Sequence, residues 1–397
     1  MTNADTKRAI GNASEDVWID VDVDSLRSNA TVLIKSTREP GSPTPRLMAV
    51  VKADGYGHGA TLAATAFIEG GADWLAVTTF TEAADLPASL LPKFDAGPDC
   101  QDVNGVLIFA PPTDSSQALY AITHGITMTV CDRDHLEIVA KAAACAGQNG
   151  RVHLKVDTGM GRLGLSPNAS FEVARAIADC PNVTMTGVYT HFAQALAVDL
   201  TPTRRALDAF TDCCNRLREA GIDPGIRHAA NSAASLRLPE SRLDMVRIGT
   251  LLYGQYPGPS VPRVDGLSTK TWSMSARAVF VHDVLAGTTV GYGAEYRAKT
   301  SRRVAVLPVG FGDGFATAPT SLYHGFRGVK TVLGQILGKG QPYVTFDGHK
   351  APVLGRVAMQ MIVVDVTDIP TKVEIGSIAT IPMRRIAARS SIPRKSR

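Results

Sequence analysis

Met48-Ala49-Val50-Val51-Lys52 is followed directly by Ala53-Asp54-Gly55-Tyr56-Gly57-His58-Gly59. The apolar residues are typical of a buried β-strand, and the glycines favour a tight turn into the next helix. The lysine is therefore predicted at the C-terminal tip of the strand. A lysine that is desolvated there can become a nucleophilic amine and form a Schiff base. On this stretch alone, a lysine whose charged end reaches solvent is the commoner alternative.

Apolar segments of strand length alternate with amphipathic stretches of helix length over much of the chain. The helical stretches include 132–146, 169–179 and 203–220. This alternation predicts an α/β fold, a (β/α)₈ TIM-like barrel, with a doubly wound sheet as the alternative. The predicted barrel strands are 48–51, 74–77, 106–109, 126–130, 152–156, 185–189, 226–229 and 245–248.

The residue composition and pattern of the sequence change after Gly254. Residues 256–262 are rich in proline and glycine, which indicates a linker. Short β-branched runs and turns follow, which predict a small all-β C-terminal domain. The β-branched runs are 275–281, 303–309, 352–354 and 361–366, and two long loops are expected at 88–104 and 317–342. The predicted organisation is a flexible N-terminus at 1–16, a barrel at 17–256 that opens with a short strand at 17–21, a β domain at 263–383 and a basic tail at 384–397.

Composition limits the classes of function. The net charge is +4, and the tail alone carries Arg384, Arg385, Arg389, Arg394, Lys395 and Arg397. The rest of the chain is nearly neutral, so nucleic acid is not predicted as a partner, and the tail is predicted to be solvated and frayed. No apolar run is long enough to span a membrane, and the polar N-terminus does not resemble a signal peptide. The six cysteines lack metal-binding spacing, which predicts reduced thiols in the cytoplasm and no metal site.

Polar side chains follow several predicted barrel strands. Because a (β/α)₈ barrel brings the C-terminal ends of its strands together, these side chains should share one mouth. Hydroxyl, amide and glycine groups after the last two strands suit a phosphate. With the lysine, a histidine and an arginine, they suggest pyridoxal phosphate. The candidate residues are Lys52, Lys155, Arg162, His191, Asn231, Ser232, Arg247, Gly249 and Thr250.

At this point the sequence closely resembles the bacterial alanine racemases, from about residue 17 to residue 366. The first matching motif is Val51-Lys52-Ala53-Asp54-Gly55-Tyr56-Gly57-His58-Gly59. The others are Lys155…Arg162, Thr190-His191-Phe192-Ala193, His228…Asn231-Ser232, Val246-Arg247…Leu252-Tyr253-Gly254, Val290-Gly291-Tyr292-Gly293, Gly310-Phe311-Gly312-Asp313-Gly314 and Gly355-Arg356-Val357-Ala358-Met359.

The resemblance implies a homodimeric fold-type III pyridoxal phosphate enzyme that racemises alanine, supplying D-alanine for peptidoglycan. It implies that Lys52 carries the cofactor and that Tyr292 reaches the partner's site, so that each serves one face of the substrate. Tyr56, Asn231, Ser232, Gly249 and Thr250 would surround the phosphate. His191 would lie against the ring, and Arg247 would bond its nitrogen. Arg162 and Met359 would bind substrate, and Lys155, carbamylated in some relatives, would support Arg162.

The sequence also departs from the family pattern. The departures at Leu196, Phe311, Thr317 and Gln360 suggest a less charged access route and turnover of larger amino acids such as serine.

Three rival interpretations of the function remain: a racemase of another preference, a decarboxylase of basic amino acids and a non-catalytic pyridoxal phosphate carrier. The decarboxylases use a cysteine in the β domain, and the carriers lack that domain, so both fit this chain less well.

Overall fold

The computed structural model describes residues 15–39, 41, 43–92, 105–317 and 340–397. The chain forms two compact units. The barrel unit consists of residues 23–271. The β unit combines the segment that ends at Asp22 with residues 272–397.

Eight parallel strands form the nearly closed sheet of the barrel unit. Neighbours in the sequence are neighbours in the sheet, and the last strand lies beside the first, which is the order of a barrel. Backbone bonds from Asp244 N to Arg227 O (3.1 Å) and from Arg247 N to Ala230 O (2.9 Å) join the two end strands. The predicted (β/α)₈ barrel is thereby confirmed. Its strands are β2 (Arg46–Val50), β3 (Trp74–Val77), β4 (Gly105–Ile108), β5 (Thr127–Val130), β6 (Gly150–Lys155), β7 (Val183–Tyr189), β8 (Ile226–His228) and β9 (Met245–Ile248).

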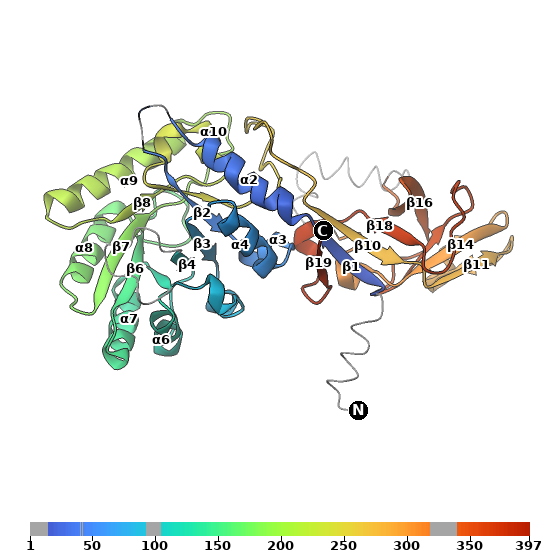
Figure 1. The fold of residues 1–397 in the computed structure, drawn as a ribbon, viewed down its shortest axis with the longest axis horizontal. Helices are drawn as coiled ribbons and strands as arrows, with labels where there is room; N and C mark the ends of the chain where they lie inside the picture. The colour runs from blue at the N-terminus through green and yellow to red at the C-terminus, as the bar shows by residue number, and fades with distance from the viewer. Residues whose placement is uncertain (1–14, 40, 42, 93–104, 318–339) are drawn as a thin grey trace. The chain divides into compact units, whose positions relative to one another are not determined.

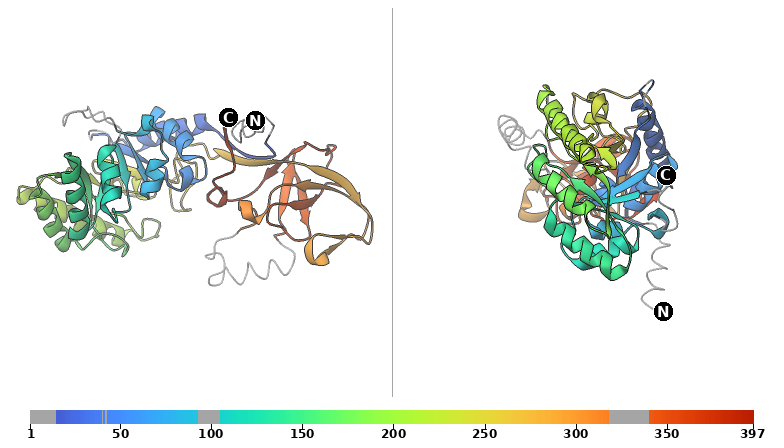
Figure 2. Two further views of the ribbon diagram at one scale, coloured as in Figure 1. Left: turned by 90° about the horizontal axis from the view of Figure 1, so that it is seen from below. Right: turned by 90° about the vertical axis from the view of Figure 1, so that its left-hand side faces the viewer.

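The helices of the barrel unit lie outside the strands (Figures 1 and 2). Four begin where the side chain of Thr79, Asp114, Asp132 or Ser166 accepts hydrogen bonds from the first turn, which satisfies N–H groups that have no partner within the helix. The helices are α2 (Val23–Ser36), α3 (Lys52–Tyr56), α4 (Ala60–Glu69), α5 (Phe80–Ala84), α6 (Ser115–Thr123), α7 (Arg133–Ala146), α8 (Pro167–Ala178), α9 (Thr201–Glu219) and α10 (Ala234–Arg237), with 3₁₀ turns η1 (Ala88–Leu90) and η2 (Pro239–Ser241).

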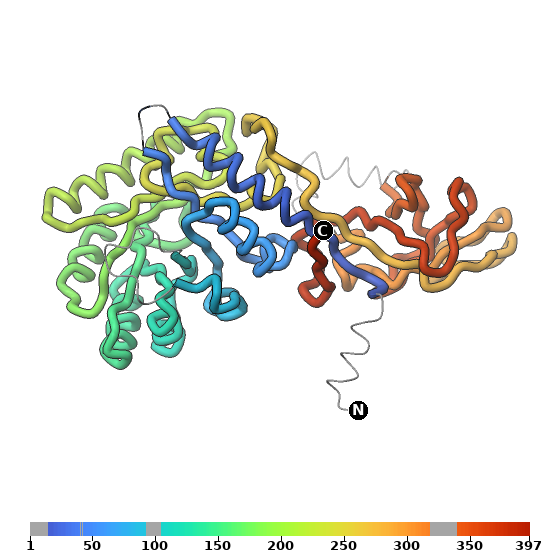
Figure 3. Tube along the Cα trace, in the orientation of Figure 1, coloured from blue at the N-terminus to red at the C-terminus, as the bar shows by residue number. Residues whose placement is uncertain are grey.

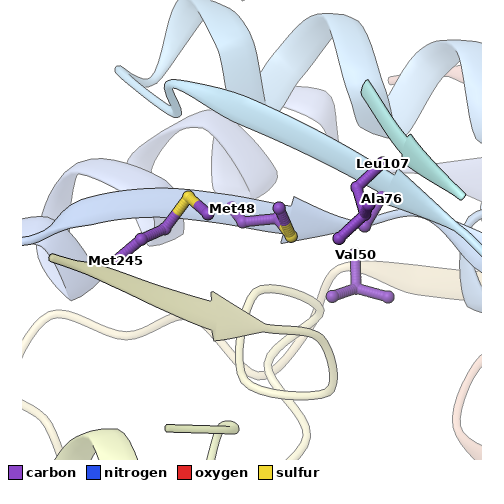
Figure 4. Packing of buried hydrophobic residues seen from close by; sticks show 5 residues of the cluster. All are labelled: Met48, Val50, Ala76, Leu107 and Met245. Carbon is purple, nitrogen blue, oxygen red and sulfur yellow. The ribbon is translucent and has the colours of Figure 1, made fainter. Parts of the chain in front are cut away.

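Strands covered on both faces need apolar side chains in both directions, which explains their continuous apolar sequences. Met48, Val50, Ala76, Leu107 and Met245 form one buried cluster inside the barrel (Figure 4). The cluster includes Val50, the last residue of β2, two positions before Lys52.

The β unit contains a nine-stranded sheet in the order β11-β14-β17-β16-β15-β18-β10-β1-β19 and a small ladder, β12-β13. The predicted all-β domain is confirmed. Its strands are β1 (Val17–Val21), β10 (Trp272–Arg277), β11 (Phe280–Val284), β12 (Thr289–Val290), β13 (Tyr296–Arg297), β14 (Arg302–Leu307), β15 (Tyr343–Phe346), β16 (His349–Leu354), β17 (Ile362–Asp365), β18 (Ile378–Ile381) and β19 (Arg394–Ser396), with turns η3 (Tyr292–Ala294), η4 (Phe311–Asp313) and η6 (Arg385–Ala387).

Two predicted boundaries are wrong. The strand at 17–21 does not open the barrel, because β1 pairs antiparallel with β10 in the β unit. The division between the units falls after Thr271, beyond the predicted linker, and the Thr271 hydroxyl donates to Tyr253 O (2.9 Å) within the barrel unit. Both errors have one cause: contacts between residues far apart in the sequence, such as β1 with β10 and Asn29 with Ser268, leave no local signal. Of the predicted loops and N-terminus, residues 1–14, 93–104 and 318–339 lie outside the described residues, while 88–90 form η1.

The predicted frayed tail is also wrong. Residues 394–396 form β19, which pairs parallel with β1, and the two chain segments run side by side in Figure 3. Trp18 of β1 lies against the cations of Arg277 and Lys395, at 5.1 and 4.8 Å from the ring centre. Arg389 Nη2 lies 3.1 Å from Oδ1 of the buried Asp313. The charged composition concealed the strand because main-chain bonds to β1 and the ion pair of Lys395 with Glu15 (3.0 Å), rather than apolar burial, hold it.

We expect Arg389→Ala to lower the free energy of unfolding by about 1–2 kcal/mol, between the values for exposed and buried ion pairs. The reason is that Asp313 is buried and would lose its cationic partner, whereas Arg389 is half exposed. Urea unfolding measures this, with Arg397→Ala as the matched tail control, since the bond from Arg397 to Val21 O uses its backbone N–H. Equal losses in both variants would contradict the assignment.

Candidate active site

Lys52 stands where the sequence predicts it, immediately beyond β2, and opens an unusual turn. Ala53, Asp54 and Tyr56 have φ of 52°, 51° and 52°, so these three non-glycine residues lie in the left-handed region with Gly55 and Gly57. Each such residue costs roughly 1–2 kcal/mol. The sequence predicted a glycine turn here, but not that its other residues would share the strained conformation. Strain of this kind is frequent at functional sites.

A cavity of about 440 Å³ opens beside Lys52, which is within the range of small-molecule sites, about 300–1,000 Å³. It brings together ten of the twelve predicted site residues: Lys52, Tyr56, Lys155, Arg162, His191, Asn231, Ser232, Arg247, Gly249 and Thr250. Thr78, Phe109, Leu163, Tyr189 and Leu196 also line it.

The two lysines of the cavity hold their protons weakly. Burial, and then the Arg162 guanidinium, lower the pKa of Lys52 below its usual value. Burial, and then Arg247, lower the pKa of Lys155 to about 8, and its Nζ donates to Val156 O (2.6 Å). A lysine reacts as a nucleophile when its amine is deprotonated, and burial favours that form. The structure therefore favours a nucleophilic Lys52 over a lysine whose charged end reaches solvent.

We expect Lys155 to make the stability of the cofactor-free protein depend on pH. The folded pKa of about 8 lies below the unfolded value near 10.5, so the folded state is penalised at pH 7.5 and the penalty disappears as pH rises toward 10.5. Lys155→Met should therefore stabilise the protein by about 2–3 kcal/mol at pH 7.5, and by less at pH 9.5. Urea unfolding at both pH values measures the gain. A gain independent of pH would contradict the assignment.

Several hydrogen bonds fix the guanidinium of Arg247, near the end of β9. Its Nη1 donates to His228 O (2.8 Å) and lies 3.1 Å from His228 Nδ1, and its Nη2 donates to Thr190 O (2.6 Å) and Ala229 O (3.0 Å). Burial lowers the pKa of Arg247 to about 10, which still leaves a cation at neutral pH. Burial, and then Arg247, lower the pKa of His191 to about 3, so His191 is neutral beside it.

Behind Arg247 lies a buried histidine pair. Because a guanidinium can only donate, His228 Nδ1 must accept, and its Nε2–H then points at His153 Nδ1 (2.9 Å). Tyr189 stacks on His228 and places its ring 5.3 Å from the Arg247 cation and 5.5 Å from Lys155. Sequence reasoning found His228 but missed His153 and Tyr189, which have no distinctive local pattern.

The predicted phosphate groups form a cradle. Ser232 Oγ accepts from Gly249 N (3.0 Å), which draws the loops after β8 and β9 together. A side chain at Gly249 would place its Cβ 2.5 Å from Tyr56 Oη, so only glycine allows the tyrosine to approach. Burial raises the pKa of Tyr56 to about 12, and its hydroxyl therefore remains a hydrogen-bond donor.

The charged side chains of the described residues that line the cavity are all basic. Its lining holds four cationic side chains, those of Lys52, Lys155, Arg162 and Arg247, and among the described residues no carboxylate lines it. Such a site suits a ligand with several negative charges, such as a phosphate ester together with a carboxylate. A reactive lysine, a phosphate cradle and a fixed guanidinium therefore fit pyridoxal phosphate.

Tyr292 and Met359, the remaining two predicted site residues, belong to the β unit and do not line this cavity. The two residues are 71% and 63% exposed. Two backbone bonds join the neighbouring loops: Gly312 N donates to Met359 O (2.9 Å), and Phe311 N donates to Ala358 O (3.1 Å). The cavity of the barrel unit therefore does not test the roles predicted for these two residues.

No group of three or more His, Cys, Asp or Glu side chains arranged to hold a metal ion occurs within the described part of the chain. Across the same residues, no helix combines the length and apolar character needed to cross a membrane.

Comparison with known proteins agrees with the geometry. The model of the alanine racemase N-terminal domain matches residues 21–257, and that of the alanine racemase C-terminal domain matches residues 271–391. The chain belongs to the alanine racemase family. The alanine racemase of Methanococcus maripaludis is 34% identical over 369 residues, covering 93% of this chain and 89% of that protein. That of Desulforamulus reducens is 34% identical over 380 residues, covering 94% and 93%.

Solved structures of the alanine racemase family match over nearly the whole chain. Alanine racemase from Clostridium difficile 630 superposes with a TM-score of 0.78 at 26% identity, covering 96% of this chain and 89% of that one. Alanine racemase from D-cycloserine producing Streptomyces lavendulae gives 0.75 at 29% identity, covering 97% and 98%. The family expected from the sequence motifs is confirmed, as is its pairing of a barrel with a β domain.

Proposed function

We propose that this chain is an alanine racemase that interconverts L- and D-alanine with pyridoxal phosphate as its cofactor. The single observation that carries the proposal is the cavity at Lys52, where a readily deprotonated amine, a phosphate cradle and three further cations meet without a carboxylate among the described lining residues. Family membership gives the reaction type, and the cavity supplies the chemical groups that it needs.

Each part of the cavity has a task in this proposal. Lys52 would hold the cofactor covalently, and the cradle of Tyr56, Ser232 and Gly249 would bind its phosphate. Arg247 would face the ring nitrogen as a fixed cation and leave that nitrogen unprotonated. The neutral His191 would lie against the ring, and Arg162 would bind the substrate. When bound, the cofactor withdraws electrons and so acidifies the α-proton of the amino acid.

Racemisation requires a proton to leave one face of Cα and another to arrive at the opposite face. Lys52 Nζ serves one face, because burial and Arg162 already weaken its hold on a proton. The partner's Tyr292 serves the other. As a general acid it donates its hydroxyl proton to Cα, and as a general base its phenolate takes the Cα proton, in both cases from within hydrogen-bond reach.

The β unit supports a homodimer with shared sites. Tyr292, Phe311, Met359 and Met361 are large apolar side chains, and each is at least half exposed. Exposed apolar groups on joined loops are typical of interaction surfaces, and here they include both predicted site residues of this unit. A second copy of the chain would bury them over the cavity of its partner.

Chiral analysis of the purified protein tests the function. With pyridoxal phosphate, L-alanine should be converted until both enantiomers are present in nearly equal amounts, and D-alanine should give the same mixture. A protein that binds the cofactor at Lys52 yet forms no D-alanine would instead support the non-catalytic carrier.

The width of specificity rests on Leu196, which lines the cavity and is 45% exposed there. An apolar wall excludes a small added group by only about 1–3 kcal/mol, so serine should be turned over at a measurable fraction of the alanine rate. We expect Leu196→Asp to change the ratio of kcat/KM for serine to that for alanine by about tenfold. Val198→Asp is the matched control, since Val198 is 95% exposed and does not line the cavity. Strict alanine preference, unchanged by Leu196→Asp, would end this idea.

A further inference from the structure

The turn that carries Lys52 is held by a residue outside the cavity. Glu82, in the first turn of α5, accepts through Oε1 from Ala53 N (2.8 Å), the backbone N–H next to Lys52. Its Oε2 accepts from Thr78 N (2.6 Å) and Thr79 N (3.2 Å), just beyond β3. One carboxylate therefore ties together the C-terminal ends of two neighbouring barrel strands.

The other end of the turn is held separately. Asp54 Oδ1 accepts from Ala60 N (3.0 Å), and His58 contacts both Gly55 O (3.2 Å) and the Thr271 hydroxyl (3.0 Å). These bonds fix Gly55 to Ala60, whereas Ala53 N is held by Glu82. Ala53 is also the first residue of the left-handed run, at φ 52° and ψ 52°. Lys52 directly precedes this residue.

We propose that Glu82 is a positioning residue that holds the strained left-handed turn at Ala53 and thereby aims Lys52 Nζ into the cavity. The inference rests on the proposed role of Lys52 and adds a second task to a residue that also caps a helix. The carboxylate is suited to both, since it has acceptors for three N–H groups at once. Glutamine has one carbonyl oxygen, so its NH₂ group would face at least one of these donors.

The chain offers a control for the helix-capping role. Thr79 Oγ accepts from Glu82 N (3.2 Å), and Thr79 and Glu82 together form the capping box of α5. Thr79→Ala removes the cap bond and leaves the carboxylate free to bind Ala53 N. An effect that Glu82→Gln has and Thr79→Ala lacks therefore comes from the bonds of the carboxylate, and at residues 53–57 from the one to Ala53 N.

The first measurement needs no cofactor. Amide hydrogen exchange at residues 53–57 of the cofactor-free protein should be about tenfold faster in Glu82→Gln, the factor expected for one lost charged hydrogen bond, and near wild type in Thr79→Ala. Equal protection in Glu82→Gln and wild type would overturn the proposal. This measurement does not depend on whether Lys52 binds pyridoxal phosphate. It can therefore contradict the role of Glu82 without contradicting the proposed function, and the reverse also holds.

The second measurement follows Lys52 itself. With pyridoxal phosphate, Glu82→Gln should weaken cofactor binding about tenfold and change the visible circular dichroism of the bound cofactor, which reports its orientation, while Thr79→Ala keeps the wild-type spectrum. Adding Ala53→Gly to Glu82→Gln should restore part of both, because glycine adopts positive φ without steric cost. Should Glu82→Gln alone not fold, the double variant should fold. A wild-type spectrum in Glu82→Gln, or no recovery in the double variant, would overturn the proposal.

Discussion

Lys52→Ala will leave the protein unable to retain pyridoxal phosphate covalently and will reduce alanine racemisation by on the order of 10⁴-fold or more, because one side chain supplies both the attachment point and a proton-transfer group. The fold should survive, since Lys52 is only partly buried and the cluster below it consists of apolar side chains. Absorbance of the bound cofactor and a chiral alanine assay measure the two losses together.

A lysine of the same chain provides the control. Lys141 lies in α7, so Lys141→Ala should behave as wild type. Borohydride reduction of the wild type, followed by peptide mapping, should label Lys52. A label on Lys155, the other weakly protonated lysine of the cavity, would contradict the assignment.

Tyr292→Phe should lower kcat by about 10²–10⁴-fold, the usual contribution of a general acid or base, while cofactor binding stays unchanged. The aromatic ring remains, so the apolar surface of the β unit is preserved. Tyr296→Phe is the control, because this tyrosine packs against the buried cluster of Val284, Val290, Ala298, Val304 and Leu354 in the same unit.

Mixed dimers then test whether the sites are shared. A dimer of one Lys52→Ala and one Tyr292→Phe subunit would have one site with both lesions and one intact site. After random exchange of equal amounts, about one quarter of wild-type activity should return, because about half of the dimers are mixed and each has one working site. If subunits exchange and no activity returns, Tyr292 does not act across the interface.

The barrel was predictable from local sequence patterns. The candidate cavity was predictable because this fold brings the C-terminal ends of its strands together. Continuous apolar runs mark strands buried on both faces, and the barrel gathers whatever follows their C-terminal ends. Lys52, His191 and Arg247 therefore came together in the structure, although nearly 200 residues separate the first from the last.

Other features depend on contacts that local patterns do not encode. Ala53 and Asp54 adopt the left-handed conformation against their own preference, and two hydrogen bonds hold it: Ala53 N donates to Glu82, and Ala60 N donates to Asp54. The strand at 394–396 is rich in charge and forms because β1 offers it a free edge. The role of His153 depends on its contact with His228, which is 75 residues away in the sequence, so no local pattern indicates it.

The most direct test of the central claim, racemisation by two bases, is to incubate L-alanine and, separately, D-alanine with the cofactor-loaded protein in D₂O and to measure the deuterium content of each enantiomer. The account predicts that both reactions approach equal amounts of the enantiomers, and that at early times the product carries deuterium at Cα while the remaining substrate carries little, because a different group protonates each face. Deuterium entering the substrate as fast as the product would indicate a single base, and alanine recovered without deuterium or inversion would contradict the proposed function altogether.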